Sequence, residues 1–125
     1  MRKGEVWVNE IAPRPHNSGH QTIEANVTSQ YEEHLRAIQN LPLGDTSIIS
    51  PSAMVNLLGA EGYSGLALYE GLAEVLEVGG VYVHLYGKKL TKPFRKMGHV
   101  TVVDRDMENL KKKATFVKNT LKVIA

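Results

Sequence analysis

The chain has 125 residues, of which 42% are hydrophobic, which is enough for one compact domain or two small subdomains. Its formal net charge of +2 is close to neutral, and it does not by itself favour a nucleic-acid or membrane partner. The absence of cysteine excludes disulfides, thiolate metal sites and a cysteine nucleophile. With no apolar run as long as a membrane span and no secretory signal, we expect a soluble cytoplasmic protein.

The first part of the chain predicts a strand, a loop and a helix. Residues 5–11 alternate in a β-rich composition, which predicts a strand. Two prolines exclude regular structure from residues 12–20, which we expect to form a loop. Ser29 and Glu32 match a capping box, and apolar residues at helical spacing follow them. A helix should therefore begin near Thr28 and end before the Leu-Pro-Leu-Gly run at 41–44.

The second part of the chain contains alternating and helical apolar patterns in turn. The expected elements are strands at 53–58, 81–86 and 99–103, a helix at 66–76, a basic connection at 88–96, and a last helix with Asp106 as its N-cap. Because strict βαβ spacing is missing, this order predicts an α+β fold. We place a boundary that divides the chain into residues 1–42 and residues 43–125.

The loop at 12–20 follows a carboxylate and carries several polar side chains. Glu10, at the end of the first expected strand, has the oxygen ligands that suit Mg²⁺. Arg14 could present its planar guanidinium to a carboxylate, bicarbonate or phosphate, with His16 close by. The alternative is a surface loop with a salt bridge.

A zinc site formed by His16 and His20 is a second possibility for this loop. The two histidines are four residues apart and would share one face of a helix. Pro15 and Gly19 disfavour a helix there, and a third ligand is not spaced nearby. Hydrogen-bonding histidines are therefore the favoured interpretation.

The basic connection at 88–96 has five cations in nine residues. Such a loop could bind a phosphate, although an ordinary solvated loop has the same composition. A Walker-type glycine loop is not present in the sequence. Binding of nucleic acid is disfavoured because aromatic residues are not interleaved with the cations and the overall charge supplies no basic face.

Several separated blocks resemble one enzyme family. The run Asn-Glu-Ile-Ala-Pro-Arg-Pro-His-Asn-Ser-Gly-His at 9–20 is similar to the signature of the 5-(carboxyamino)imidazole ribonucleotide synthase family, within the ATP-grasp superfamily. Further blocks follow in the family's order: Thr-Ser-Gln-Tyr-Glu at 28–32, His-Leu-Arg-Ala at 34–37, Leu-Pro-Leu-Gly at 41–44, Met-Val-Asn-Leu-Leu-Gly at 54–59, His-Leu-Tyr-Gly-Lys at 84–88 and Arg-Lys-Met-Gly-His-Val-Thr at 95–101. The resemblance therefore covers nearly the whole chain.

The resemblance implies a fold and an activity. Residues 1–42 would be the tail of an ATP-grasp C-lobe, and residues 43–125 a small β-rich, barrel-like rudimentary hybrid motif with a C-terminal helix. Family members are ligases of de novo purine (IMP) biosynthesis. They use ATP to activate bicarbonate, with carboxyphosphate as the expected activated form, and carboxylate the exocyclic amine of aminoimidazole ribonucleotide.

The resemblance also implies roles for individual residues. Glu10 would be the second of two acidic Mg²⁺ ligands. Arg14 and His16 would be catalytic, holding bicarbonate or the carboxylated intermediate against the amine, with the imidazole relaying a proton. The residues expected to bind the ribose 5′-phosphate are Lys88, Arg95, Lys96 and Asn17. Phe94 is a departure from the family, since glycine is common at its position.

Family members are several times longer than this chain, and the missing parts include the adenine pocket. We therefore expect the chain to be inactive alone and to bind no cofactor, with Mg²⁺ and ATP belonging to the full-length enzyme. The alternative is a non-catalytic sugar-phosphate-binding or regulatory module, which the retained Glu10 disfavours. Exposed strand edges and apolar surface predict a homodimer or larger oligomer, without nucleic-acid or membrane partners.

Overall fold

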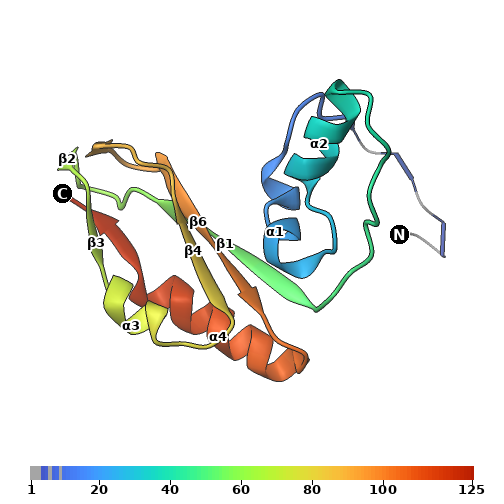
Figure 1. Ribbon diagram of the computed structural model, residues 1–125. Coiled ribbons are helices and arrows are strands. Elements are labelled where there is room, and N and C mark those ends of the chain that lie inside the picture. The colour runs from blue at the N-terminus through green and yellow to red at the C-terminus, as the bar shows by residue number, and fades with distance from the viewer. Residues whose placement is uncertain (1–3, 6, 9) are drawn as a thin grey trace.

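The computed structural model describes residues 4, 5, 7, 8 and 10–125, in which helices and strands are mixed (Figure 1). The helical elements are the 3₁₀ turn η1 (Asn17–Gly19), α1 (Thr22–Ala25), α2 (Gln30–Ile38), α3 (Leu72–Leu76) and α4 (Met107–Thr120). The strands are β1 (Ser52–Leu58), β2 (Gly65–Leu66), β3 (Leu68–Glu70), β4 (Val81–Leu85), β5 (Leu90–Thr91), β6 (Lys96–Val103) and β7 (Lys122–Ile124). Over this described part, each helix is too short or too polar to cross a membrane.

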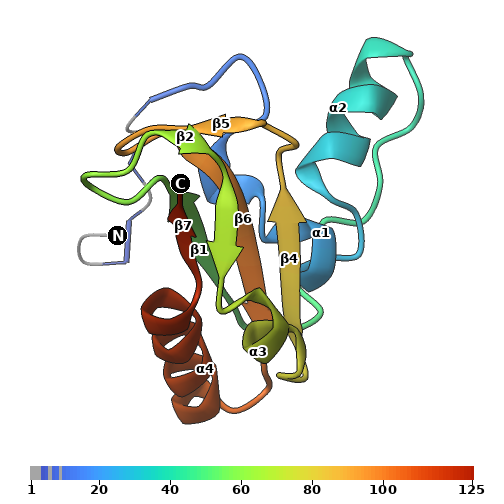
Figure 2. The same ribbon diagram turned by 90° about the vertical axis from the view of Figure 1, so that its left-hand side faces the viewer.

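The main sheet has three antiparallel strands in the order β1-β6-β4. Its centre is fixed by Val100, which is paired with Val55 on β1 and with Val83 on β4. Central β6 is buried along almost its whole length, as expected of a strand that is covered on both faces. Two smaller antiparallel pairs, β2–β5 and β3–β7, complete the strands and are visible beside the main sheet in Figure 2.

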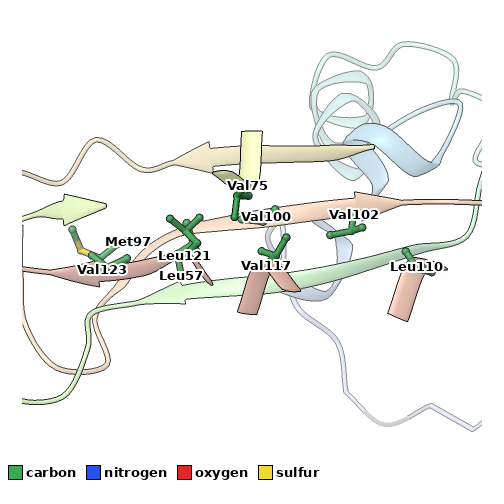
Figure 3. Packing of buried hydrophobic residues seen from close by; sticks show 9 residues of the cluster. All are labelled: Leu57, Val75, Met97, Val100, Val102, Leu110, Val117, Leu121 and Val123. Carbon is green, nitrogen blue, oxygen red and sulfur yellow. The ribbon is translucent and has the colours of Figure 1, made fainter. Parts of the chain in front are cut away.

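Helix α4 covers one face of this sheet and closes the hydrophobic core. The helix begins where the Asp106 side chain accepts a hydrogen bond from the Asn109 backbone N–H, 2.7 Å away. Spacing of three to four residues then places its apolar side chains on one face. Figure 3 shows these side chains with those of the strands and α3: Leu57, Val75, Met97, Val100, Val102, Leu110, Val117, Leu121 and Val123.

The opposite face of β6 is covered by the N-terminal part of the chain. Side chains alternate across a strand, so His99 and Thr101 lie on the face opposite to Val100 and Val102, and they are buried as well. Helix α1 packs against β6 there, as both ribbon views show. This layer brings loop residues from the first twenty positions onto the sheet and thereby creates the candidate site.

Several sequence-based predictions are confirmed. The mixed α+β class holds, and the expected strands at 53–58, 81–86 and 99–103 correspond to β1, β4 and the C-terminal part of β6. Ser29 caps α2 by accepting a hydrogen bond from the Glu32 backbone N–H at 3.2 Å. The barrel-like closure of residues 43–125 stays a prediction, because the strands form one open three-stranded sheet and two ribbons.

The helix expected at 66–76 is wrong in its first half, where the structure has β2 and β3. Gly71 has a φ of +79°, in a region that interrupts a right-handed helix, so α3 begins only after it. The residues before it pair with β7, from Leu68 with Ile124 to Glu70 with Lys122. This long-range pairing overrides the local helical spacing.

The first expected strand, at 5–11, is also wrong for most of the residues that can be judged. Trp7, Val8 and Ile11 belong to no strand and are more than 70% exposed. Val6 and Asn9 lie outside the described residues. Trp7, Val8, Glu10 and Ile11 are not paired with a strand among the described residues. Without such pairing, their backbone groups have no ladder of hydrogen bonds to hold them in a strand. The short elements η1, α1, β5 and β7 were not expected either.

Candidate functional site

Three polar side chains from distant parts of the chain meet at the edge of the main sheet. Asn17, in the loop before α1, donates from Nδ2 to Oδ1 of Asn56 on β1 at 2.8 Å. Its own Oδ1 accepts from Nζ of Lys96 at 3.2 Å. Because the ammonium group can only donate, it fixes the orientation of the Asn17 amide. The structure thus joins two of the sequence-predicted residues, Asn17 and Lys96, although 79 positions separate them.

The other two expected phosphate ligands lie on the same basic segment. Lys88 is half-buried, donates to the Lys96 carbonyl oxygen at 2.6 Å, and has its ammonium 5.8 Å from the Tyr86 ring centre. Arg95 donates from Nη1 to the Leu90 carbonyl oxygen at 3.2 Å. All of these acceptors are uncharged, so none of them offsets the positive charge of the cations. Lys88 and Lys96 are in contact, whereas Arg95 is directed toward the β5 backbone.

His16 is the residue before Asn17 in the sequence, and its ring has a defined orientation. Its Nδ1 accepts from the Ser18 backbone N–H at 3.3 Å and lies 2.9 Å from the Ser18 hydroxyl oxygen. Since a backbone N–H can only donate, Nδ1 is the unprotonated nitrogen of the neutral ring and Nε2 carries the proton. The exposed ring therefore offers an N–H donor, and the expected proton relay would have to use a second tautomer.

Glu10 and Arg14 are not joined to this cluster. Both are exposed, and neither makes a side-chain hydrogen bond or ion pair with another described residue. The part of the chain that the structure describes contains no group of three or more histidine or acidic side chains that could hold a metal ion. Glu10 thus supplies one carboxylate and does not form a Mg²⁺ site by itself.

A cluster of three histidines lies beneath the polar residues, between α1 and the sheet. His99 on β6 stacks on His84 of β4 with ring centres 4.5 Å apart, and on its other side meets His20 at 4.7 Å. The Tyr86 hydroxyl lies 3.1 Å from Nδ1 of His99. The carboxylate of Glu24 on α1 lies 2.6 Å from Nε2 of His84. We call these five residues the histidine cluster; it packs the N-terminal part of the chain against the sheet.

Burial keeps two rings of the histidine cluster neutral. The pKa of His99 is lowered to about 4, mainly by burial and then by the neighbouring His84 and His20. The pKa of His20 is also lowered, mainly by burial and then by the positive charge of Lys96. Burial raises the pKa of Tyr86. At neutral pH these groups therefore act as hydrogen-bonding and stacking partners without charge.

The prediction that the histidines of the loop form hydrogen bonds is confirmed. His16 bonds Ser18, and Nδ1 of His20 lies 3.0 Å from Nε2 of Gln30 and 2.6 Å from the Tyr31 hydroxyl. Sequence reasoning did not identify Gln30, Asn56, Tyr86 or the remaining histidines as parts of the site. Asn56 and Tyr86 lie inside blocks that carry the family resemblance, but their strand positions indicated only packing.

Comparisons with known proteins agree with the resemblance. Residues 52–113 match the family model described as the phosphoribosylaminoimidazole carboxylase C-terminal domain, and residues 1–31 match the ATP-grasp domain. The N5-carboxyaminoimidazole ribonucleotide synthase of Bacillus subtilis is 51% identical over 98 residues, which are 78% of this chain and 24% of the relative. That of Aquifex aeolicus is 45% identical over 122 residues, 98% of this chain and 32% of the relative.

Solved structures give the same result. The N5-carboxyaminoimidazole ribonucleotide synthetase of Thermotoga maritima superposes on the whole chain with a TM-score of 0.93 and 60% identity, and 35% of its own chain is covered. The Aspergillus clavatus enzyme, solved with ADP and 5-aminoimidazole ribonucleotide, has a TM-score of 0.72 and 34% identity over 85% of this chain and 28% of its own. The chain thus spans about a quarter to a third of the length of these relatives.

Proposed function

Because the chain belongs to the N5-carboxyaminoimidazole ribonucleotide synthase family of ATP-grasp ligases, we propose that it carries the part of the enzyme that binds aminoimidazole ribonucleotide and its incoming carboxyl group. The contact between Lys96 and Asn17 carries this proposal. It supports one shared pocket for the loop before α1 and the basic segment.

In this proposal the ribose 5′-phosphate binds where Lys88, Lys96 and Asn17 meet, with Arg95 closing over it. The two ammonium groups now donate to a carbonyl and to an amide oxygen, which are neutral acceptors. A phosphate offers charged oxygens, and charge-assisted hydrogen bonds are about twice as strong as neutral ones. Exchange of the internal acceptors for phosphate oxygens would therefore favour binding.

Arg14 and His16 act on the carboxyl group in the same proposal. The Arg14 guanidinium would hold two oxygens of bicarbonate or of its activated form, and Nε2–H of His16 would donate to one of them. The amine nitrogen of the nucleotide would then attack the carboxyl carbon of the phosphorylated form, the bond from that carbon to the phosphate oxygen would break, and inorganic phosphate and the amine proton would leave. ATP would supply the phosphoryl group that makes the carboxyl carbon reactive, in a step for which this chain provides positioning residues.

Glu10 would provide one oxygen ligand for Mg²⁺, and the remaining ligands would come from ATP and from parts of the enzyme that the relatives carry beyond this span. We propose accordingly that the chain alone is inactive and binds neither ATP nor Mg²⁺. The division into residues 1–42 and 43–125, with a barrel-like second part, belongs to this proposal. The histidine cluster would then be the contact between the two parts.

Calorimetric titration of the chain with aminoimidazole ribonucleotide tests the proposal. We expect binding by the wild type, and a dissociation constant raised about tenfold or more in Lys88→Ala, Arg95→Ala and Lys96→Ala, from the loss of one charge-assisted hydrogen bond each. Lys112→Ala, which removes an exposed lysine from α4, is the matched control and should leave the affinity unchanged.

The outcomes separate the two functional interpretations. Binding that depends on these cations supports the substrate pocket, whereas a folded wild type that does not bind would contradict a preformed pocket in this chain. Equal affinity for ribose 5-phosphate and for the complete nucleotide would favour the alternative, a sugar-phosphate-binding module. A ligase should discriminate between them, because its site must also hold the aminoimidazole ring near Arg14 and His16.

A further inference from the structure

We infer that Gln30 is a positioning residue that holds His16 in the site, and that it does so only while His20 presents an unprotonated ring nitrogen to it. The catalytic significance of this arrangement rests on the proposed function. The arrangement itself rests on three hydrogen bonds and one close contact that involve described residues only.

The Gln30 side chain holds both peptide groups that flank His16. Gln30 is the first residue of α2, and its Oε1 accepts from the His16 backbone N–H at 3.0 Å. Its Nε2 donates to the His16 carbonyl oxygen at 2.8 Å. One side chain thus satisfies the donor and the acceptor of the residue that we place beside the carboxyl group. Because the backbone is held on both sides, the position of the His16 Cα, from which the ring extends, is fixed.

The orientation of the Gln30 amide follows from these two contacts. A flipped amide would place its oxygen against the His16 carbonyl oxygen and its NH₂ group against the His16 N–H. In the orientation that satisfies both, Nε2 lies 3.0 Å from Nδ1 of His20. Both hydrogens of Nε2 are then donated, one to each residue. For Gln30 to donate to it, Nδ1 of His20 must accept, and the Tyr31 hydroxyl, 2.6 Å from the same nitrogen, then donates to it as well. In this arrangement the proton of the neutral ring is on Nε2.

Protonation of His20 would break this arrangement. A protonated Nδ1 carries a hydrogen that the Tyr31 hydroxyl, 2.6 Å away, can accept, whereas the NH₂ group of Gln30 loses its acceptor and faces a positive ring. The rings that face His20 are those of Tyr31 on α2 and His99 on β6. Farther charges come from Lys96, His16 and His84, all of which oppose a positive ring. The Glu24 carboxylate is paired with His84, on the far side of His99.

Gly19 provides an independent argument for the close approach of Gln30. A Cβ atom at position 19 would lie 2.5 Å from Oε1 and 2.6 Å from Cδ of Gln30, closer than atoms can pack. Glycine at this position therefore leaves room for the amide. Gly19→Ala should displace the Gln30 side chain without changing its chemistry, and it complements a substitution of Gln30 itself.

Hydrogen exchange of the His16 backbone amide, followed by NMR in the whole chain, reports the hydrogen bond to Gln30 directly. We expect Gln30→Ala and Gly19→Ala to lower the protection factor of this amide at least about tenfold, while buried amides of β6 keep theirs. Gln39→Ala removes an exposed glutamine at the other end of α2 and is the matched control. In the wild type, the protection should fall on acidification when His20 takes up its proton, and because burial lowers the pKa of His20 this should need a more acidic pH than an exposed histidine does.

Ring ¹⁵N shifts give a second measurement that does not depend on a substitution. At neutral pH, Nδ1 of His20 should have the shift of an unprotonated acceptor and Nε2 that of a protonated nitrogen. An unchanged His16 protection factor in folded Gln30→Ala, or a proton on Nδ1 of His20, would overturn the inference. Titration with aminoimidazole ribonucleotide tests the proposed function separately: absence of binding by the wild type rejects that function and leaves the exchange result to decide this inference.

Discussion

His99 shows how one buried side chain makes the stability of the whole fold depend on pH. It is only 2% exposed in the middle of β6, and Nε2 has no hydrogen-bond partner among the described residues. Burial, and after it the neighbouring His84 and His20, lower its pKa from 6.5 to about 4. The unfolded chain therefore binds a proton at a higher pH than the folded chain does. Stability is then constant above pH 6.5, falls between pH 6.5 and 4, and levels off below.

We expect His99 to account for a loss of about 3 kcal/mol in the free energy of unfolding between pH 7 and pH 4, since each pKa unit corresponds to about 1.4 kcal/mol. Urea unfolding at a series of pH values measures this loss. His99→Phe keeps a ring in the cluster but cannot be protonated, so the loss should shrink by about that amount. The exposed His34 is the control, because His34→Gln should leave the pH dependence as in the wild type. Parallel curves for His99→Phe and wild type would contradict the assignment.

Phe94 occupies the backbone conformation that the family's common glycine would adopt freely. Its φ is +62°, its side chain is 69% exposed, and its N–H donates to the Gly59 carbonyl oxygen at 2.9 Å. The sequence predicted that the residue departs from the family, and the structure places it in a left-handed backbone conformation. A phenylalanine in this conformation carries a cost in local strain, directly before Arg95.

Substitutions of Phe94 should rank by their tolerance of positive φ. Phe94→Val should lower the free energy of unfolding by about 1 kcal/mol, because β-branched residues are strongly disfavoured in this region. Phe94→Gly should be as stable as the wild type or slightly more so, because glycine adopts this conformation without strain. Thermal unfolding of the three proteins gives the order. A valine variant as stable as the glycine variant would show that the turn does not keep this conformation.

The residue-level roles were predictable only where the resemblance supplied them. Lys88, Lys96 and Asn17 came from motif positions, and the structure brings these three together. Asn56, the partner of Asn17, and Gln30, the partner of His16, were missed because asparagine and glutamine bond to whatever the fold places next to them. Local spacing does not show which distant residue that is. The roles of Glu10 and Arg14 stay predictions.

At the scale of elements, Gly71 separates two structures that the sequence pattern joined into one helix. Strand β3 ends and α3 begins at this glycine, whose backbone is left-handed. Leucines at 68, 72 and 76 fit a helical face, but the first of them lies in a strand that pairs with β7. Strands β1, β4 and β6 were predictable because their apolar patterns are longer, and helix α4 because it also has a clear N-cap. The shortest elements depend on pairing with distant residues.

Gly71→Ala should therefore be strongly destabilising. The new Cβ would lie 2.4 Å from the Thr120 carbonyl oxygen, and the residue would also need a φ of +79°. We expect the free energy of unfolding to fall by more than about 2 kcal/mol, measured by urea unfolding. Gly79→Ala is the matched control, because nothing lies within 4 Å of its Cβ position. A Gly71→Ala protein as stable as Gly79→Ala would argue against the left-handed junction.

At the scale of the whole molecule, the N-terminal part leaves considerable apolar surface uncovered. Helix α2 has Leu35 and Ile38 more than half exposed, and Leu41 and Leu43 follow it. Leu35 and Leu41 line a groove together with Pro42. Patches of this kind are typical of surfaces that contact another protein or another part of the same enzyme. Within the histidine cluster, in contrast, His20 and His99 are buried.

We predict that the isolated chain associates with itself through this α2 surface. Sedimentation velocity should show a mass that rises with concentration, and Ile38→Lys should shift the equilibrium toward the monomer by placing a charge in the patch. Leu76→Lys, at a comparably exposed leucine on α3, is the control and should not shift it. A wild-type chain that stays monomeric at all concentrations would rule out this prediction.

The pairing of β3 with β7 has a consequence for synthesis on the ribosome. Leu68–Glu70 leaves the exit tunnel roughly fifty residues before its partner Lys122–Ile124. At typical elongation rates of about 5–20 residues per second, β3 waits several seconds without a strand beside it. Val123, in that late partner, is also part of the core that α4 closes. The β3–β7 pair can therefore form only after α4 has been synthesised, so this part of the fold is completed last.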